Sequence, residues 1–209
     1  VEWLAHHGLE GSVVENRPLP PFADEKKPPE NGWTVGYIGR VRDIRSFELL
    51  VEAVKTIPAF ERPKLRVAGD GTAASKVRTL LMSEVEAGTI EAEVSGAFSQ
   101  SELPELLQSV DVMYAMYSPQ RGNVLQGALP VKVFDAASGG VPSVVNAGCL
   151  MADVVVSENI GAHAPWGDAE SVGQTLRSLR DTVAELAATG EREHQRWLSA
   201  MNPVLEVLQ

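Results

Sequence analysis

The sequence predicts an α/β fold, in which a Rossmann-like parallel sheet is flanked by helices. Short apolar runs typical of buried strands alternate with segments whose apolar residues recur at helical spacing. Strands that alternate with helices in this way pair in parallel, because each helix carries the chain back across the sheet in a right-handed crossover. The 209 residues suffice for one domain of ordinary size with extra segments at its ends.

The N-terminal part of the chain differs from the rest in composition. Five prolines fall between residues 18 and 29, a density that resists helix and central strand and stiffens a connection between domains. The chain begins with Val1 rather than methionine, so we expect it to be a piece of a longer protein. The expected division is an interdomain remnant and proline-rich linker at 1–31, a Rossmann-like domain at 32–189 and a helical segment at 190–209.

The first half of the domain contains three expected strands, each followed by a helix. The first strand ends at Gly39, and we expect Ser46 to cap the helix that follows. Ser101 is preferred to Ser99 as the cap of the third helix, because it places a proline in the first turn, where a missing amide costs nothing. The expected elements are strand 33–38, helix 46–57, strand 65–68, helix 73–85, strand 90–94 and a helix that begins at 101.

The second half continues the alternation around the stretch Leu129–Pro142. Pro130 suits the first turn of a helix, and Gly139-Gly140 is a stop signal. A break is expected near Pro203 in the last helix. The expected elements are strand 110–117, a helix from 130 to the glycines, strand 142–145, a short strand 162–165, and helices 171–186 and 191–208.

The composition limits the classes of partner. The chain carries 18 basic and 28 acidic residues, for a net charge of −10 and a pI of about 4.9. Such a charge disfavours nonspecific binding to nucleic acid or to anionic membranes. No apolar run approaches ~20 residues, so we expect no transmembrane segment. The single cysteine, Cys149, excludes an internal disulfide framework and favours a reducing, cytoplasmic compartment.

Against this acidic background, a basic loop follows the first strand. Arg40, Arg42 and Arg45 lie within six residues. Ligands of parallel sheets bind outside the carboxyl ends of the strands, and the planar fork of arginine suits phosphate oxygens. The loop is therefore a candidate phosphate site, although a solvated loop paired with Asp43 and Glu48 has the same pattern.

A second basic position lies at the start of the helix that follows Pro130. Lys132 falls in the first turn, where free amides and the helix dipole already favour anions. Asp135 follows three residues later on the same face, where it can accept hydrogen bonds from a ribose diol. A solvated Lys–Asp pair on an amphipathic helix has the same spacing. Two basic loops at one sheet edge together indicate an anionic ligand with more than one phosphate.

Four segments in consistent order carry a resemblance to a known family. They read WTVGYIGRVRDIRSFELLVEAV, KLRVAGDG, VSGAFSQSELPELLQSVDVMYA and LPVKVFDAASGGVPSVV. Over residues 12–186 the chain resembles the C-terminal domain of a retaining GT-B glycosyltransferase of group 1, family 4 of the glycosyltransferases. The resemblance implies that this domain binds the nucleotide-sugar donor. A separate N-terminal domain of the same chain would hold the acceptor site and any peripheral contact with a membrane.

The resemblance also implies roles for individual residues. Arg40 and Arg45 match two diphosphate-binding positions, whereas Arg42 has no counterpart and is expected to be a screened surface charge. Lys132 matches a lysine that faces the diphosphate, and Asp135 matches the glutamate that holds the ribose. The donor-binding residues implied are Gly39, Arg40, Arg45, Ala97, Phe98, Tyr117, Asn123, Val131, Lys132 and Asp135.

Further implied positions concern the base and the transferred sugar. Ala97 and Phe98 resemble the loop that flanks the base. Members of the family often carry a glutamate eight residues before the ribose-binding one, but here that position is Gly127. This departure leaves the sugar, and activity itself, open. The polar groups left to meet the sugar are those of Tyr117, Arg121, Asn123 and Gln126.

The mechanism implied by the resemblance is transfer of a hexosyl group with retention, without a metal or a cofactor beyond the nucleotide-sugar substrate. The D-x-D metal signature of the other main glycosyltransferase fold is absent from the sequence. Arg40, Arg45, Lys132 and the helix amides would neutralise the leaving diphosphate. No catalytic residue is assigned here, because a base would come from the missing domain. We therefore expect the fragment to bind nucleotide without turnover.

Three other functions remain open. The run Gly69–Ala74 fits the G-x-G-x-x-A pattern of dinucleotide-binding oxidoreductases, with Glu93 about twenty residues further on. However, the run follows the second strand, and Glu93 lies within the next strand rather than at its end. A nucleotide-sugar epimerase and a non-catalytic nucleotide-binding module share the predicted architecture.

The four histidines show no metal-site pattern. His6 and His7 are adjacent and cannot share a helix face, and His194 lies on a charged helix face, so we expect all three to be solvated. His163 lies in or beside the last strand and is expected to be packed rather than catalytic.

Overall fold

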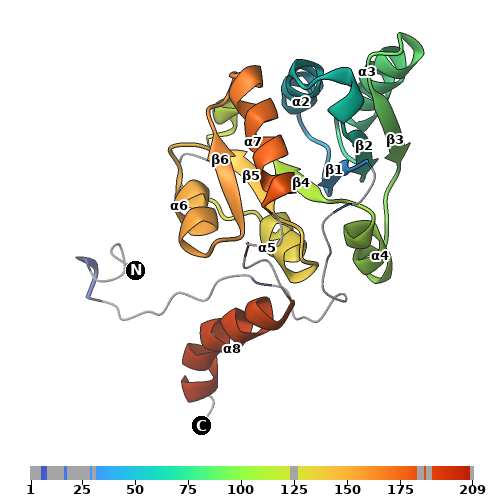
Figure 1. The fold of residues 1–209 in the computed structure, drawn as a ribbon. Coiled ribbons are helices and arrows are strands. Elements are labelled where there is room, and N and C mark those ends of the chain that lie inside the picture. The colour runs from blue at the N-terminus through green and yellow to red at the C-terminus, as the bar shows by residue number, and fades with distance from the viewer. Residues whose placement is uncertain are drawn as a thin grey trace.

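Six parallel strands form one sheet in the computed structural model, which describes residues 6–8, 17, 29, 32–122, 127–182, 186 and 190–207. The strand order is β3-β2-β1-β4-β5-β6 (Figure 1), which confirms the predicted parallel α/β fold. The strands are β1 Thr34–Ile38, β2 Lys64–Ala68, β3 Glu91–Ser95, β4 Val112–Ala115, β5 Ser143–Asn146 and β6 Gly161–Ala164.

Helices cover both faces of this sheet. Helices α2, α3 and α7 share an apolar core with one face, and α4, α5 and α6 share two further cores with the other. Successive residues of a strand point to opposite faces, so Tyr37 packs with the first set and Ile38 with the second. The helices are α2 Ile44–Thr56, α3 Ala74–Glu86, α4 Leu103–Gln108, α5 Val131–Ser138, α6 Leu150–Ser157, α7 Ala169–Asp181 and α8 Gly190–Val207.

Two helix starts differ from the predicted ones. The cap of α2 is Asp43, whose carboxylate accepts a hydrogen bond from the Arg45 amide, whereas Ser46 lies inside the helix. The Ser46 hydroxyl is buried and donates to the Met116 carbonyl oxygen, 2.7 Å away. Ser99 rather than Ser101 forms the cap before α4, because Ser99 and Glu102 make a reciprocal capping box ahead of a short 3₁₀ turn.

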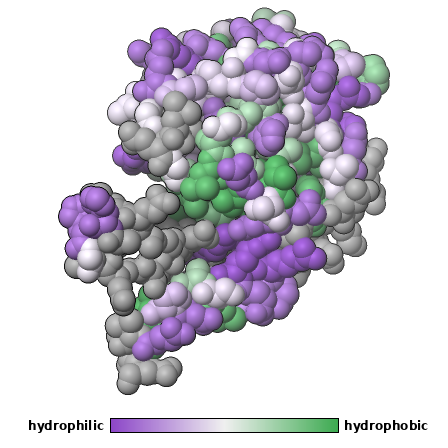
Figure 2. All heavy atoms as spheres, turned by 90° about the vertical axis from the view of Figure 1, so that its left-hand side faces the viewer, coloured by the Kyte–Doolittle hydropathy of each residue, from purple (hydrophilic) through white to green (hydrophobic). Residues whose placement is uncertain are grey.

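Helix α6 is not predicted from the sequence. Its residues LMADVVVS show no helical periodicity, because apolar side chains occur on every side. Met151, Ala152 and Val155 are buried against the sheet, whereas Leu150 and Val156 are 47% and 55% exposed. Figure 2 shows apolar residues gathered in the middle of the surface on this side of the molecule.

The last helix, α8, continues through Pro203 to Val207, so the predicted break is absent from it. Proline there removes one main-chain hydrogen bond near the end of the helix without ending it. α8 packs against α5. The predicted linker at 1–31 lies almost wholly outside the described residues, but Arg17 is described and its side chain is buried against α5, α6 and α8.

The order in which successive strands are added to the sheet reverses between β1 and β4. From β1 the sheet extends through β2 to β3, and the second half then extends from β4 through β5 to β6 on the other side. A crevice opens at such a switch point, outside the carboxyl ends of the two central strands, and this is where open α/β sheets bind their ligands. Gly39 and Tyr117, which follow the ends of β1 and β4, therefore mark the expected place of a site.

Candidate functional site

A cavity of about 560 Å³ opens at this switch point. Its wall is built by the loop after β1, the segment from Phe98 into α4, the end of β4 and the first turns of α5. The cavity thus brings together segments that are far apart in the sequence. The lining residues are Ile38, Gly39, Arg40, Arg42, Phe98, Gln100, Leu103, Leu107, Met113, Tyr117, Ala128, Leu129, Pro130, Val131, Lys132 and Asp135.

The lining side chains fall into two chemical groups. Arg40, Arg42 and Lys132 supply positive charge and Asp135 a carboxyl group, whereas the side chains from β1, α4 and β4 are apolar. A cavity that is largely apolar and holds a few convergent polar groups is typical of small-molecule sites. The concentration of positive charge in a chain of net charge −10 favours an anionic ligand.

Lys132 reaches from the first turn of α5 to the end of β1. Its Nζ lies 3.4 Å from the centroid of the Tyr37 ring and 5.5 Å from that of Tyr117. Both rings are within reach of a cation–π interaction. A Cβ on Gly39 would lie 3.4 Å from the Lys132 Cε, which is an ordinary contact distance, so the stem of the lysine packs beside this glycine. The ammonium group is thus held over the point where the loop after β1 begins.

Asp135 lies one turn further along α5, on the same wall of the cavity. The residue is half-buried, and this burial raises the pKa of the Asp135 carboxyl from 3.8 to about 6, although the charge of Lys132 opposes the change. Burial has this effect because it disfavours the ionised carboxylate. A half-buried carboxylate beside a cation is suited to accept hydrogen bonds from a ligand diol, provided that it is ionised.

The arginines that line the cavity are not the pair that was expected to bind the diphosphate, Arg40 and Arg45. Arg40 and Arg42 line the cavity, whereas Arg45 is not on its wall in the part of the chain that the structure describes. Arg45 lies in the first turn of α2, and its guanidinium donates a hydrogen bond of 2.6 Å to the Gln120 side chain. Val41 is buried between two exposed arginines, so Arg40 and Arg42 point to the same side. This alternation is the signal that could have identified Arg42.

The other predicted site residues are placed as follows. Phe98, Tyr117 and Val131 line the cavity, while Ala97 is exposed and outside the lining found among the described residues. Asn123 lies outside the described residues, as do Gln126 and the side chain of Arg121. Gly127 is half-buried and has a φ of 84°.

Gly127 stands where the family resemblance led us to expect a glutamate, and its surroundings are apolar. A Cβ at this position would lie 3.4 Å from Cδ2 of Leu150. The next two residues, Ala128 and Leu129, line the cavity. Among the described residues, apart from the chain neighbours of Gly127, only atoms of Leu150 lie within 4 Å of this Cβ.

The two glycines of the dinucleotide-like pattern have a structural reason. A Cβ on Gly69 would lie 1.9 Å from the Gly39 carbonyl oxygen, and one on Gly71 would lie 2.2 Å from that of Val41. The loops after β1 and β2 touch at these points, and their main chains exchange hydrogen bonds. Glu93 lies in the middle of β3 and forms ion pairs with Arg66 and Lys64. The pattern is thus accounted for without a dinucleotide.

The described residues contain no group of three or more histidine, cysteine, aspartate or glutamate side chains that could hold a metal ion. His163 is exposed on the edge strand β6, so the prediction that it is packed is wrong. His194 is half-buried and stacks on Trp197, with ring centroids 6.3 Å apart. Within the same residues, no helix is both long enough and apolar enough to cross a membrane.

The family model for glycosyl transferases group 1 matches residues 21–195. The chain belongs to this family. The matched region contains the whole sheet and every residue that lines the cavity. No curated protein sequence matches the chain.

Solved structures of glycosyltransferases share the fold of this group 1 domain. Anabaena HepE in complex with UDP-glucose has a TM-score of 0.65 at 16% identity, over 85% of this chain and 49% of its own. Sucrose-phosphate synthase from Thermosynechococcus elongatus has a TM-score of 0.63 at 19% identity, over 83% of this chain and 42% of its own. The group 1 domain therefore spans less than half of either protein.

A third structure matches along nearly its whole length. The catalytic domain of cholesterol-alpha-glucosyltransferase from Helicobacter pylori has a TM-score of 0.60 at 15% identity, over 81% of this chain and 99% of its own. These likenesses establish the fold of the group 1 domain, which is one half of the GT-B architecture.

Proposed function

We propose that this chain is the donor-binding half of a glycosyltransferase that transfers a hexosyl group from a nucleoside diphosphate sugar. The observation that carries the proposal is the convergence of Arg40 and Lys132 on one cavity from opposite sides of the switch point, with Asp135 one turn deeper. The first two meet the charge of a diphosphate, and the third meets the ribose. The family match to glycosyl transferases group 1 supports the same reaction class.

In this proposal the domain acts by stabilising the leaving group. Breaking the glycosidic bond leaves negative charge on the β-phosphate, and cationic groups fixed beside that oxygen stabilise the transition state more than the ground state. Arg40, Lys132 and the free amides at the start of α5 fill this role. Arg42 adds a third charge on the cavity wall, and Arg45 contributes if its guanidinium exchanges Gln120 for phosphate.

The remaining wall suits a nucleoside. The carboxylate of Asp135 accepts hydrogen bonds from the ribose hydroxyls, and Phe98 with the apolar side chains of α4 and β4 contacts the base. The solved HepE complexes contain UDP, UDP with glucose, or UDP-glucose. These neighbours favour UDP as the first nucleotide to test.

We further propose that transfer proceeds with retention, as the resemblance to family 4 implies, and that it needs no metal or cofactor. The acceptor and any general base are assigned to a second domain of a longer protein, so the fragment alone binds the donor without turnover. A cytoplasmic location fits a domain with one cysteine. Gly127 supports a second candidate, a non-catalytic nucleotide-binding module, because the carboxylate expected near the sugar is missing there.

Calorimetric titration with UDP, GDP, ADP and NAD tests the proposal. We expect at least one nucleoside diphosphate to bind more tightly than NAD and to raise the melting temperature. Ligand at ~100 times its dissociation constant adds about 2.7 kcal/mol to the free energy of unfolding. Tighter binding of NAD than of all three diphosphates would overturn the assignment. Transfer assays with a longer chain that includes the acceptor domain then separate an active enzyme from a binding module.

A further inference from the structure

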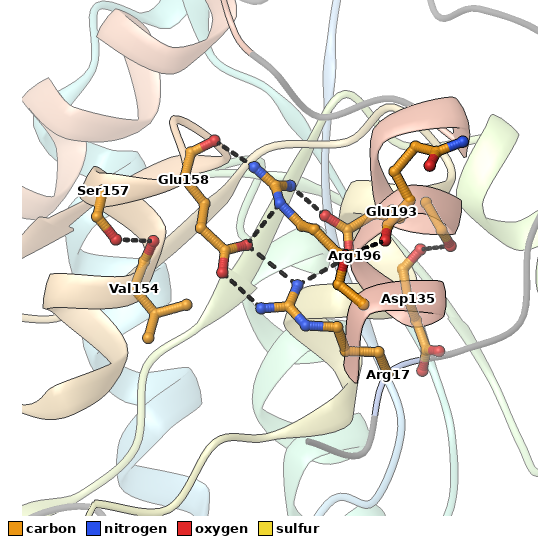
Figure 3. A network of polar contacts seen from close by, with 10 residues as sticks. Arg17, Asp135, Val154, Ser157, Glu158, Glu193 and Arg196 are labelled. Carbon is orange, nitrogen blue, oxygen red and sulfur yellow. Dashed lines mark hydrogen bonds and ion pairs between the residues drawn. The ribbon is translucent and has the colours of Figure 1, made fainter. Parts of the chain in front are cut away.

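Four charged side chains, from residue 17, the end of α6 and α8, form a cluster beside α5 (Figure 3). Arg17 lies at its centre and binds Glu158, at the end of α6, through two hydrogen bonds of 2.5 and 3.0 Å. It also binds Glu193 of α8 at 3.2 Å. Arg196 of α8 pairs with both glutamates and donates to the Glu158 carbonyl oxygen. We call these four residues the Arg17 cluster.

The Arg17 cluster is buried and balanced in charge. The side chains of Arg17 and Glu193 are 4% and 0% exposed, and those of Glu158 and Arg196 are 21% and 23% exposed. Two cations face two anions, so each buried charge has a partner. Removing one member of such a group leaves a buried charge uncompensated, which is strongly destabilising. The cluster therefore holds the chain at residue 17 and the start of α8 in a fixed place.

The same cluster touches the helix that carries the cavity residues. The guanidinium carbon of Arg17 lies 4.2 Å from the ring centroid of Phe134, which is 1% exposed in the core between α5 and α6. Phe134 lies between Lys132 and Asp135 in the sequence but faces another side of the helix. The carboxylate of Asp135 is not joined to the cluster in Figure 3. One helix thus separates the cluster from the cavity.

α5 needs support of this kind. It has eight residues, or about two turns, and helices of this length are not stable by themselves. The residue at its N-cap is Pro130, whose side chain has no group that can accept a hydrogen bond. Its position is therefore set by the side chains packed around it. Arg17 and α8 supply this packing on one side.

We propose that Arg17 and Glu193 are positioning residues for the donor site: they hold α5 so that Lys132 and Asp135 face Arg40 across the cavity. This inference rests on the proposed function, because it concerns how the same nucleotide is held. It assigns a role in nucleotide binding to residue 17 and to α8, neither of which lines the cavity. It also makes residue 17 part of the donor-binding unit rather than of a linker.

The test compares how strongly the protein prefers UDP to 2′-deoxy-UDP. Contact between Asp135 and the ribose sets this preference, so a displaced α5 lowers it. Both ligands bind the same folded molecules, and the ratio of their dissociation constants therefore does not depend on how much of a variant is folded. A role of Arg17 in stability alone leaves the ratio unchanged. The variants are Arg17→Met, Arg17→Lys and Glu193→Gln, with Arg192→Met on the exposed surface of α8 as the matched control.

We expect Arg17→Met and Glu193→Gln to weaken UDP binding about 3- to 30-fold, the range for residues that act through a neighbouring element, and to lower the preference for UDP over 2′-deoxy-UDP. Arg192→Met should keep the wild-type affinity and ratio. If Arg17→Met does not fold, Arg17→Lys, which keeps the charge without the planar fork, gives the same comparison. Wild-type affinity and ratio in the folded variants overturn the positioning role alone. Failure of the wild-type chain to bind any nucleoside diphosphate overturns the proposed function and this inference together.

Discussion

The ammonium of Lys132 lies 3.4 Å from the centroid of the Tyr37 ring, so that a side chain from α5 spans the switch point and rests on β1. Tyr37 is itself fixed, since its hydroxyl donates to the Arg40 carbonyl oxygen at 2.8 Å. Lysine loses side-chain freedom when it binds a ligand. A lysine already held against an aromatic ring has lost part of that freedom before the ligand arrives. The cation at the start of α5 is thus preorganised for an anionic ligand, such as the diphosphate of the proposed donor.

The three arginines after β1 should contribute unequally to nucleotide binding. Arg40→Ala and Arg42→Ala each remove a charge from the cavity wall, so we expect each to weaken UDP binding by about 1.5–3 kcal/mol, the range for hydrogen bonds to charged groups. Arg45→Ala should cost under about 1 kcal/mol, as an exposed charge bound to Gln120 would. Titration calorimetry measures all three. A larger loss for Arg45→Ala than for Arg42→Ala would show that the family resemblance, not the geometry, identifies the phosphate ligands.

Asp135 should distinguish ribose from deoxyribose. If its carboxylate holds the diol, Asp135→Asn weakens UDP by roughly 1.5–3 kcal/mol and weakens 2′-deoxy-UDP much less. The asparagine keeps the size of the side chain, so the packing of α5 is retained. Equal losses for the two ligands would mean that Asp135 acts through the fold or through the general field of the site. Competition titrations with the two nucleotides at one pH give the comparison.

The same residue should make stability depend on pH. The folded state raises the pKa of Asp135 from 3.8 to about 6, so between these values the folded chain binds more protons than the unfolded one. Stability contributed by this group therefore falls as pH rises from about 4 to 6, by no more than about 3 kcal/mol. In urea unfolding, the free energy of unfolding of Asp135→Asn should therefore increase relative to that of the wild type as the pH rises through this interval. Asp153→Asn, at an exposed position on α6, should show no such gain.

The glycines after β2 offer a test of the loop contact. Gly71→Ala places a Cβ against the Val41 carbonyl oxygen at a φ of 155°, so we expect it to lower the free energy of unfolding by at least about 2 kcal/mol. Gly96→Ala is the matched control, because among the described residues no atom lies within 4 Å of its added Cβ. Comparable unfolding midpoints for the two variants would show that the loops can separate without cost.

The fold could be predicted from the sequence because its central strands are short, mostly apolar runs and most of its helices are periodic. α6 escaped prediction because it is apolar on every side, so packing rather than pattern decides that it is a helix. Ser46 is a good capping residue, but the buried carbonyl of Met116 takes its hydroxyl, and Asp43 caps the helix instead. The intrinsic preference of serine for a helix N-cap is thus outweighed at Ser46 by a tertiary hydrogen bond.

The cavity was predictable in part, for a similar reason. Arg40, Lys132 and Asp135 follow from the rule that ligands bind at the carboxyl ends of parallel strands. The place of Arg42 on the cavity wall depends on which way the loop turns after its strand, and the burial of Val41 between two exposed arginines indicates this direction. The contact of Arg17 with Phe134 joins residues 117 positions apart, and no sequence pattern links the two positions.

The most direct test of the donor site combines one side chain with the phosphates of the ligand. Dissociation constants of UDP and uridine are measured for the wild-type chain and for Lys132→Met, with Lys76→Met on the exposed surface of α3 as control. If Lys132 meets the diphosphate, Lys132→Met weakens UDP by about 1.5–3 kcal/mol and leaves uridine almost unchanged, while Lys76→Met affects neither. Equal weakening of UDP and uridine, or no change in either, would contradict a diphosphate site at the start of α5.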